Sequence, residues 1–482
     1  MIDEPIAVAA RGRANSLAEV IVGAVGDRSA RGIAAAVGRL ISAGELAVHT
    51  RLPTVRELSR ELGVSPTTVS EAWQSLAAVG AIDARGRQGT YVRQPTGPSS
   101  PRRYRRVTEG PGRFALDLST GTPDPALLPD LGPVIARVNR QSLTSSYLDQ
   151  PVLPQLAERV RADWPFVPEE LTMVDGAMDA LDRVAGVVVR LGDRVVVEHP
   201  TFPPLLDLLE LLGAEVIGVD LDEQGMRADA LAAQLQHGVK AVFLQPRAHN
   251  PTGVTLTAQR GAELAAVLAG AVEPGGAGGP AGRGAASGPR GETIIVEDDH
   301  SGDIASGALV SLGAWLPHRT VHIRSYSKSH GPDLRLAAVG GAGEVVSAVA
   351  NRRLLGPGWS SRILQAVLLE MLGHQPTIDA VAAARIEYAA RRAAVSRVLA
   401  DAGVGFTGTD GINLWMQVAD ERSALLTLAA QGIGAAPGEP FMVRDDTPSL
   451  RVTVGLIDHD LQASAHRLAA AAGNQPTRRG QR

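Results

Sequence analysis

The chain has no cysteine among its 482 residues. This absence excludes disulfide bonds, thiolate catalysis and zinc sites with cysteine ligands. Long apolar runs are also absent, and no stretch approaches the length that a membrane-spanning helix needs. The N-terminus carries Asp3 and Glu4 and lacks a basic and then apolar signal pattern. We therefore expect a cytoplasmic protein.

Lysine is almost absent as well. Lysine and arginine together number 47, and only Lys240 and Lys328 are lysine. A chain that uses arginine for nearly every positive charge has kept an amine at these two positions. A guanidinium does not lose its proton, so it cannot replace an amine that must attack a carbonyl. Lys328 is either such an amine or an ordinary surface lysine, and composition alone favours neither.

Acidic and basic residues are unevenly distributed along the chain. The length predicts two or three domains, and the formal net charge is −4. Residues 28–106 contain 13 arginines and five acidic residues, which gives this segment +8 and leaves −12 for the remainder. A basic front segment on an acidic body indicates that nucleic acid binds the front.

The basic segment has the order of a winged helix-turn-helix. Residues 1–27 show no strong pattern, and we expect them to form a loose leader. Apolar residues then recur at helical spacing from Ile33 to Ile41, and a second helix is predicted over residues 55–62. Ser65 and Pro66 suit the N-cap and first position of a third helix. Two short strands flank the basic residues 85–89.

This block resembles the GntR-type DNA-binding domain in the motifs RLPTVREL (51–58), LGVS (62–65) and GRQGTYV (86–92). The resemblance implies that third-helix residues reach base edges and that arginines meet phosphates or the minor groove. The residues concerned are Thr67, Thr68 and Ser70 for the bases, and Arg51, Arg56, Arg85 and Arg87 for the backbone. Pro66 stands where the family usually has an arginine, so one DNA contact is missing. The alternative is a protein-binding winged helix with a solvated basic face.

We predict three segments: a winged helix-turn-helix over 28–94, a linker over 95–113 and a larger domain over 114–472. The linker is rich in proline and then in arginine, which makes it semi-rigid. Its arginines either add non-specific DNA affinity or belong to a solvated tether.

The larger domain alternates apolar strands with helix-length segments, which predicts an α/β fold with a mainly parallel sheet. Seven strands are expected, near 171–174, 194–198, 215–219, 241–245, 293–297, 320–324 and 336–339. Residues 273–291 are a low-complexity insert. After Gly358 the pattern is helical and ends with a strand near 450–454, which predicts a smaller α+β subdomain.

Lys328 follows one of these strands within the stretch Ser325-Tyr326-Ser327-Lys328, and Arg335 comes seven residues later. Ligands bind at the carboxyl ends of strands in α/β sheets. The stretch resembles the lysine segment of pyridoxal-phosphate (PLP) aminotransferases of fold type I. The resemblance implies a Schiff base on Lys328. It also implies that Ser325, Ser327 and Arg335 bind the cofactor phosphate, for which hydroxyls and a guanidinium are suited.

The same resemblance extends to other strand ends in family order. It implies phosphate binding by the backbone of Gly176, Ala177 and Met178 at a helix N-terminus, ring stacking by Phe202, and a contact of Asn250 with the ring 3′-oxygen. Asp298 would pair with the pyridine nitrogen. His300 stands where the family has tyrosine, and its imidazole could donate a similar hydrogen bond. An alternative use of the Asp298-Asp299-His300 run is a divalent metal site, although no further ligand cluster is near it.

Three residues complete the resemblance. Arg451 matches the arginine that binds the substrate carboxylate, Gly121 would line the substrate mouth, and Tyr147 matches a tyrosine that reaches the phosphate of a neighbouring subunit. Phe202 and His300 both lack the phenol that the family has at these positions.

A GntR-type winged helix followed by an aminotransferase-like domain resembles the MocR family of transcriptional regulators. The resemblance implies a homodimer that binds operator DNA and PLP, and a small amine or amino acid as effector. A first alternative is an active aminotransferase whose front domain is secondary. A second is a sensor of PLP itself that controls vitamin B6 supply.

Overall fold

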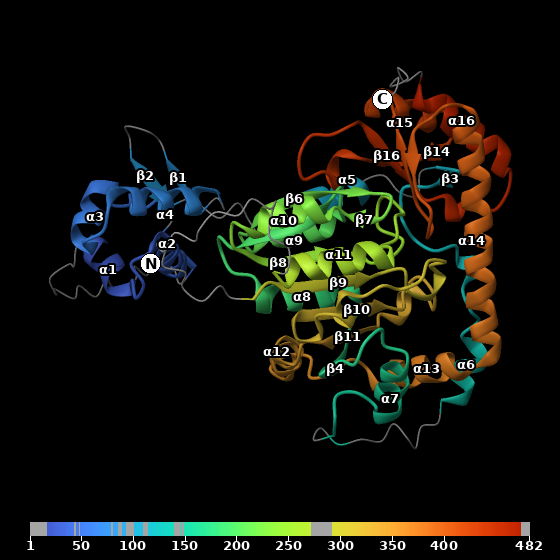
Figure 1. The fold of residues 1–482 in the computed structure, drawn as a ribbon, viewed down its shortest axis with the longest axis horizontal. Helices are drawn as coiled ribbons and strands as arrows, with labels where there is room; N and C mark the ends of the chain where they lie inside the picture. The colour runs from blue at the N-terminus through green and yellow to red at the C-terminus, as the bar shows by residue number, and fades with distance from the viewer. Residues whose placement is uncertain are drawn as a thin grey trace, which may run out of the picture. The chain divides into compact units, whose positions relative to one another are not determined.

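The computed structural model forms two compact units, Met1–Ser100 and Pro101–Arg482, and each is described by itself (Figure 1). The structure describes residues 17–42, 45–47, 49–78, 81–84, 89–92, 101–108, 114–138, 146, 149–270 and 292–473. Among these residues, no helix combines the length and the hydropathy of a membrane span.

The described part of the first unit is a winged helix-turn-helix. Its elements are α1 (Leu17–Ala24), α2 (Ala30–Ser42), α3 (Val55–Leu62), α4 (Pro66–Ala78), β1 (Ile82–Ala84) and β2 (Thr90–Val92). Helix α3 begins at a capping box, in which Thr54 and Glu57 each bind the other's backbone N–H. It ends at Gly63, whose φ of 67° lies in the left-handed region that glycine adopts without strain. β1 and β2 pair antiparallel, as the predicted wing requires.

Helix α1 corrects the prediction of a loose leader over residues 1–27. Ile21 is fully buried in the core of the unit, together with Ile33, Leu58 and Val69. The pattern was missed because α1 has only eight residues and buries one large apolar side chain.

The second unit is built on an eight-stranded sheet with the order β4-β11-β10-β9-β8-β5-β6-β7. Its strands are β4 (Glu170–Val174), β5 (Arg194–His199), β6 (Glu215–Asp222), β7 (Gly225–Met226), β8 (Val239–Leu244), β9 (Ile294–Asp299), β10 (Thr320–Ser325) and β11 (Ala337–Gly341). Strands from β10 to β6 pair in parallel, whereas β11 is antiparallel to both neighbours and β7 to β6. All seven predicted strands are present. The predicted number was one too small, because a two-residue strand produces no apolar run.

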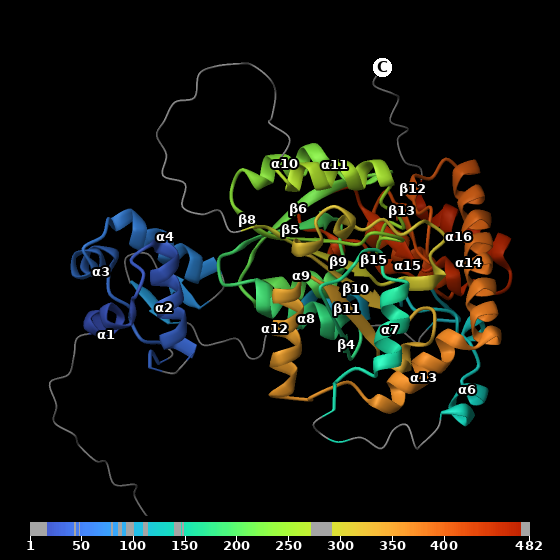
Figure 2. The same cartoon turned by 60° about the horizontal axis from the view of Figure 1, so that its bottom comes forward.

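Helices cover both faces of this sheet, because alternate residues of each strand point to opposite faces. Val195 and Val197 of β5 belong to one hydrophobic cluster, and Val196 to another. The first cluster includes residues of α8 (Ala177–Val188), α9 (Pro203–Leu211) and α12 (Gly343–Leu354), and the second includes residues of α10 (Ala228–Leu235) and α11 (Ala258–Leu268). Figure 2 shows α10 and α11 on one side and α8 and α12 on the other.

The predicted α+β subdomain follows the long helix α14 (Gln375–Asp401), which runs along one edge of the unit in Figure 1. It contains a four-stranded sheet of β12 (Phe406–Thr407), β13 (Leu414–Gln417), β16 (Ser449–Val452) and β15 (Ala436–Pro437), with α15 (Glu421–Ala430) and α16 (Leu461–Ala472). An early strand, β3 (Leu116–Asp117), pairs in parallel with β14 (Ile433–Gly434). This pairing brings the start of the unit to the subdomain. The remaining helices, α6 (Gly132–Arg137), α7 (Pro154–Ala162) and α13 (Arg362–Gly373), contribute to a further apolar cluster.

Residues Arg102–Thr108, which were expected in the linker, form helix α5 of the second unit. Arg103 donates to the Met442 carbonyl oxygen at 2.7 Å and binds Glu210 at 2.8 Å, and Arg106 binds Glu439 at 2.5 Å. These two arginines therefore have acidic or carbonyl partners in their own unit, which contradicts a fully solvated tether.

Candidate functional site

The predicted site residues gather at the carboxyl ends of the central strands. Ser325 at the end of β10 pairs with Ala337 of β11, which pairs with Val174 at the end of β4. The residues after β10 and after β4 therefore emerge at the same edge of the sheet. Asp298 lies near the end of β9, opposite Ile323 of β10. The register of β4, β11, β10 and β9 thus brings three predicted segments to one edge of the sheet.

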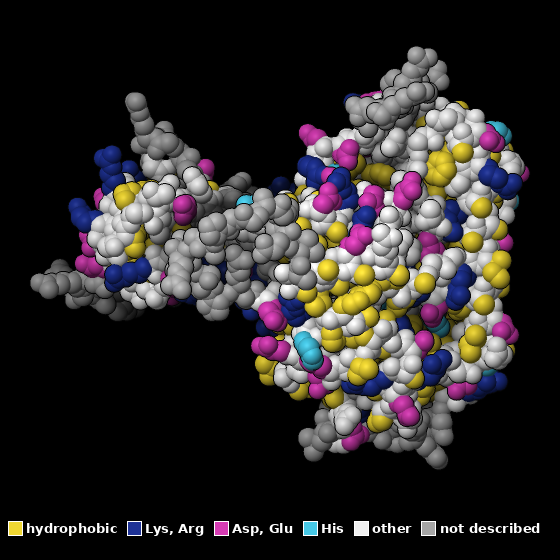
Figure 3. Space-filling view, in the orientation of Figure 1, with side chains coloured by type: hydrophobic (Ala, Val, Ile, Leu, Met, Phe, Trp, Pro, Cys, Tyr) yellow, Lys and Arg dark blue, Asp and Glu magenta, His cyan; other side chains and the backbone are white. Residues whose placement is uncertain are grey.

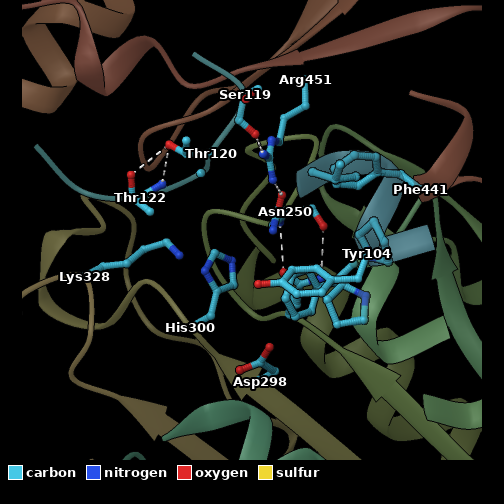
Figure 4. Close-up of a pocket in the computed structure, with 16 residues that line it drawn as sticks. Tyr104, Ser119, Thr120, Thr122, Asn250, Asp298, His300, Lys328, Phe441 and Arg451 are labelled. Atoms are coloured by element: carbon cyan, nitrogen blue, oxygen red, sulfur yellow. Dashed lines mark hydrogen bonds between the residues drawn. The ribbon is translucent and has the colours of Figure 1, made fainter. Parts of the chain in front are cut away.

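Lys328 lines a cavity of about 320 Å³ at this edge, shown in Figure 4. Burial lowers the pKa of its amine from 10.5 to about 8, and Arg451 adds to the effect, whereas Asp298 opposes it. A substantial fraction of the amine is therefore neutral near pH 8, which is the form that attacks a carbonyl. The structure brings the predicted nucleophile into a cavity rather than onto the surface.

Asp298 lines the same cavity, and its Oδ1 atom is buried without a hydrogen-bond partner. Burial raises the pKa of this carboxyl from 3.8 to about 7; Lys328 opposes the shift, and Asp299 and Glu198 add to it. A buried, unpartnered acceptor is costly unless a donor binds it. The protonated ring nitrogen of PLP is a donor of this kind, so Asp298 fits the cofactor that the resemblance implies.

The predicted phosphate-binding residues also lie together. The Ser325 and Ser327 hydroxyls are hydrogen-bonded at 3.0 Å, and Arg335 donates to the Asp175 carbonyl oxygen at 3.1 Å. A Cβ atom at Gly176 would lie 3.0 Å from the Arg335 guanidinium, and its φ of 103° is a conformation that favours glycine. Gly176 is the N-cap of α8, and Ala177 and Met178 form its first turn. Two hydroxyls, a guanidinium and a helix N-terminus fit a phosphate dianion.

His300 and Phe202 line the cavity where the family has tyrosines. The His300 Nε2 atom lies 3.0 Å from the Ala248 carbonyl oxygen, and its Nδ1 atom lies 3.3 Å from the Ser301 hydroxyl. Both ring nitrogens therefore have protein partners, and the hydrogen bond expected from His300 to the 3′-oxygen is not available in this arrangement. Burial lowers the pKa of His300 well below 6.5, with Lys328 adding to the shift, so the ring is neutral.

The alternative of a divalent metal at Asp298, Asp299 and His300 has less support from the structure. Asp299 accepts two 2.8 Å hydrogen bonds from Arg247, and these occupy the carboxylate that a metal would need.

Arg451 lies across the cavity from Lys328 (Figure 4). Its guanidinium donates to the Asn250 side-chain oxygen at 3.4 Å and to the Ser119 carbonyl oxygen, and its Nε atom has no partner. A Cβ atom at Gly121 would lie 2.9 Å from this guanidinium, which explains the glycine. Burial lowers the pKa of Arg451 to about 10, so the group is cationic at neutral pH. A ligand carboxylate that binds Arg451 would relieve this buried charge.

In the first unit, Thr67 is exposed in the first turn of α4, and Ser70, one turn later, is half-buried. The Thr68 hydroxyl is hydrogen-bonded to Ser65 at 2.8 Å, so it helps to cap the helix. Arg51 and Arg56 are exposed. Arginine side chains project around α3 in Figure 3. The exposed Thr67 hydroxyl and the exposed arginines are thus groups for which DNA contacts are predicted.

Both units of the structure match known protein families. The sequence model "Bacterial regulatory proteins, gntR family" matches residues 29–92, and "Aminotransferase class I and II" matches residues 115–271 and 294–468. A protein of Salmonella typhimurium named "Vitamin B6 salvage pathway transcriptional repressor PtsJ" is 34% identical over 430 residues, which cover 87% of this chain and 92% of that protein. The chain belongs to the MocR-type regulators of the GntR family.

Further similarities are consistent with a MocR-type transcriptional regulator that binds DNA. The "HTH-type transcriptional regulator TauR" of Rhodobacter capsulatus is 28% identical and covers 83% of this chain and 87% of its own. Among solved structures, Pyrococcus horikoshii kynurenine aminotransferase superposes with a TM-score of 0.65 at 22% identity, covering 77% and 93% of the two chains. Thermus thermophilus aspartate aminotransferase gives 0.62 at 19% identity, covering 78% and 97%. These two structures show that the second unit has the aminotransferase fold.

Several residues of the MocR-type site were not predicted. Gln245 holds the Asn250 turn through two backbone hydrogen bonds, and Thr453 accepts from the Gly121 backbone N–H at 3.0 Å. Tyr104 and Val107 of α5 line the cavity from the segment expected to be a linker. Of these residues, only Gln245 could have been found from the sequence, because it lies at the end of a predicted strand, where ligand-binding residues are expected. Tyr147, Arg85 and Arg87 lie outside the described residues.

Proposed function

We propose that this regulator binds PLP at Lys328 and senses a small amine that carries a carboxylate. The carrying observation is that the Lys328 amine, the unpartnered Asp298 oxygen and the Arg451 guanidinium face one cavity. PLP, when bound, supplies an aldehyde that condenses with amines and a ring that draws electrons. Lys328 would hold the aldehyde carbon and Asp298 the ring nitrogen. Ser325, Ser327, Arg335 and the start of α8 would hold the phosphate.

An effector would then bind at the remaining part of the cavity. Its carboxylate fits Arg451, where Asn250 and the Ser119 carbonyl oxygen already orient the guanidinium. Its amine would compete with Lys328 for the PLP aldehyde. We infer that the protein acts as a homodimer and that effector binding shifts it between states with different operator affinity. Such a shift requires different effector affinities for the two states.

A second candidate is a sensor of PLP itself. It is favoured by the similarity to PtsJ, which is named a repressor of vitamin B6 salvage. In this case PLP binding alone would change operator affinity, and an added amine would change nothing further.

Borohydride reduction of the PLP-loaded protein is expected to attach the pyridoxyl group to Lys328. Lys328 is the lysine that lines the cavity, whereas Lys240 lies within β8. Peptide mass analysis after reduction locates the group. Labelling of Lys240, or no labelling, would contradict PLP binding at Lys328.

Arg56→Ala is expected to weaken binding to every duplex and to reduce the salt slope by up to about one counterion per lost phosphate contact. Arg56 is exposed on α3. Thr67→Ala is the matched change on α4 and is expected to alter sequence preference with little change in slope. Fluorescence anisotropy with promoter and unrelated duplexes, at several salt concentrations, separates the two effects. Equal slopes for Arg56→Ala and the unaltered protein would exclude a phosphate contact by this arginine.

A further inference from the structure

Helix α5 (Arg102–Thr108) forms part of the wall of the cavity that contains Lys328 and Arg451. Tyr104 is 46% exposed and lines the cavity. In Figure 4 its ring extends into the cavity and its hydroxyl points toward His300. The cavity therefore contains a phenol after all, supplied by a helix at the start of the unit.

Hydrogen bonds and ion pairs attach α5 to the rest of its unit. The backbone N–H groups of Arg103 and Tyr104 donate to the two Asp207 carboxylate oxygens at 3.2 and 3.0 Å. Glu210 and Glu439 bind arginines of the helix and are both more than half exposed. Exposed ion pairs are individually weak and are screened by salt. These exposed ion pairs therefore contribute little to holding α5 in place.

A second contact joins α5 to the carboxylate-binding arginine. Val107 packs against the cluster of Trp415, Ala436 and Phe441. The Arg451 guanidinium carbon lies 5.2 Å from the centre of the Phe441 ring. A ligand that binds Arg451 would thus affect α5 through Phe441, and a ligand that fills the cavity would touch Tyr104 directly.

Helix α5 is also the first described element after the DNA-binding unit. Strand β2 ends at Val92 and α5 begins at Arg102. The position of α5 therefore sets where the chain between the two units is attached. A ligand that fixes or releases α5 changes the range of positions open to the DNA-binding unit.

We propose that α5 is the element through which the cavity controls DNA binding, with Tyr104 as the residue that contacts the effector. This inference rests on the proposed function, because it assumes an effector in the cavity. The effector class is a small amine whose carboxylate binds Arg451 and whose side chain lies against the Tyr104 ring. Effector binding holds α5 in place, and an unfilled cavity leaves it free to detach.

Hydrogen exchange of residues 101–108 in the full chain, freed of PLP, tests this coupling. Two ligands are compared: pyridoxamine phosphate, which fills the cofactor part alone, and N-(5′-phosphopyridoxyl)-L-alanine, which adds a carboxylate for Arg451. The second is expected to slow exchange in α5 more than the first. It is also expected to change affinity for a promoter duplex by about fivefold or more, a typical coupling between two sites.

Three variants separate coupling from binding. Tyr104→Ala is expected to lose the difference between the two ligands in both α5 exchange and DNA affinity. Asp207→Asn, which weakens the docking of α5 from outside the cavity, is expected to give fast α5 exchange with either ligand. Arg102→Ala, on the exposed surface of the same helix, is the control and is expected to behave like the unaltered protein.

Three outcomes would count against the proposal, two against the coupling role of α5 and one against the proposed function. If N-(5′-phosphopyridoxyl)-L-alanine binds but α5 exchanges equally with both ligands, α5 is not the coupling element, although the proposed function stands. The coupling role of α5 is likewise excluded if Tyr104→Ala keeps the full ligand difference. If neither ligand binds the unaltered protein, the proposed function itself is overturned and the inference falls with it.

Discussion

Lys328→Ala is expected to abolish covalent retention of PLP and, with it, the response of DNA binding to an amine effector. No other lysine lines the cavity, and arginine cannot supply the attacking amine. Operator binding in the absence of cofactor and effector should persist, because the residues predicted to bind DNA belong to the first unit. Absorbance of the bound cofactor and anisotropy with a promoter duplex measure the two properties.

Lys240→Ala is the matched control for this prediction. It removes the second lysine of the chain from β8 without changing the cavity. The control should retain both the cofactor absorbance and the effector response. A normal effector response in Lys328→Ala would show that the signal does not pass through this amine.

The cofactor-free protein is expected to become more stable when Asp298 and Lys328 are neutralised together by Asp298→Asn and Lys328→Met. Asp298 is buried and Lys328 is half-buried, and desolvation is the largest influence on the pKa of each. Replacing buried charged pairs by neutral groups of similar volume typically stabilises a protein by about 1–4 kcal/mol or leaves it unchanged. PLP binding would offset the free-energy cost of these two charges, because the cofactor would bind both groups.

The gain in the free energy of unfolding of this double variant should depend on pH. The Asp298 pKa is raised to about 7, so its destabilising effect appears as pH rises from about 4 to 7 and is complete above 7. The Lys328 pKa is lowered to about 8, so its destabilising effect is complete below 8 and disappears as pH rises toward 10.5. The stability difference should therefore be largest between pH 7 and 8.

Urea unfolding of the cofactor-free proteins from pH 4 to pH 10 measures this difference. The variant with Asp182→Asn and Lys240→Met changes the same charges outside the cavity and is the control. A double variant at the cavity that is less stable than the unaltered protein at pH 7–8 would contradict the account of these two charges.

Much of the sheet edge that carries the candidate site could be predicted from the sequence. Seven strands appear as apolar runs, and residues near or after their carboxyl ends, such as Lys328, Asn250 and Asp298, meet at one sheet edge because parallel strands are aligned. The order of α2, α3 and α4 in the first unit was predictable for a different reason, since Thr54, Gly63 and Pro66 mark helix ends by local chemistry.

What could not be predicted depends on contacts between distant segments. The docking of α5 requires Asp207 and Met442, which lie more than a hundred residues away. A segment with four arginines and little apolar surface therefore looks like a tether. The neutral, internally bonded state of His300 depends in the same way on the Ala248 carbonyl oxygen. Propensity and periodicity contain no information on such partners.

Neither Phe202 nor His300 supplies a phenol at its own position, and Tyr104 reaches the cavity from a different helix. We therefore expect slow or partial amino transfer, because these two positions give less support to proton transfer near the ring. In a regulator the ligand in the cavity controls DNA binding, whereas in an active aminotransferase the cavity converts the ligand. Slow turnover with a strong effect on DNA binding is the pattern that a sensor predicts.

The most direct test measures the affinity of the full-length protein for its promoter duplex in three states: without PLP, with PLP, and with PLP plus candidate amino acids. Absorbance records the cofactor, and assay of the keto acid product records turnover in the same samples. We expect the affinity to change with cofactor or amino acid while turnover stays slow. An affinity that is the same in all three states, together with rapid multiple turnover to a keto acid, would contradict the regulator account and favour an active aminotransferase.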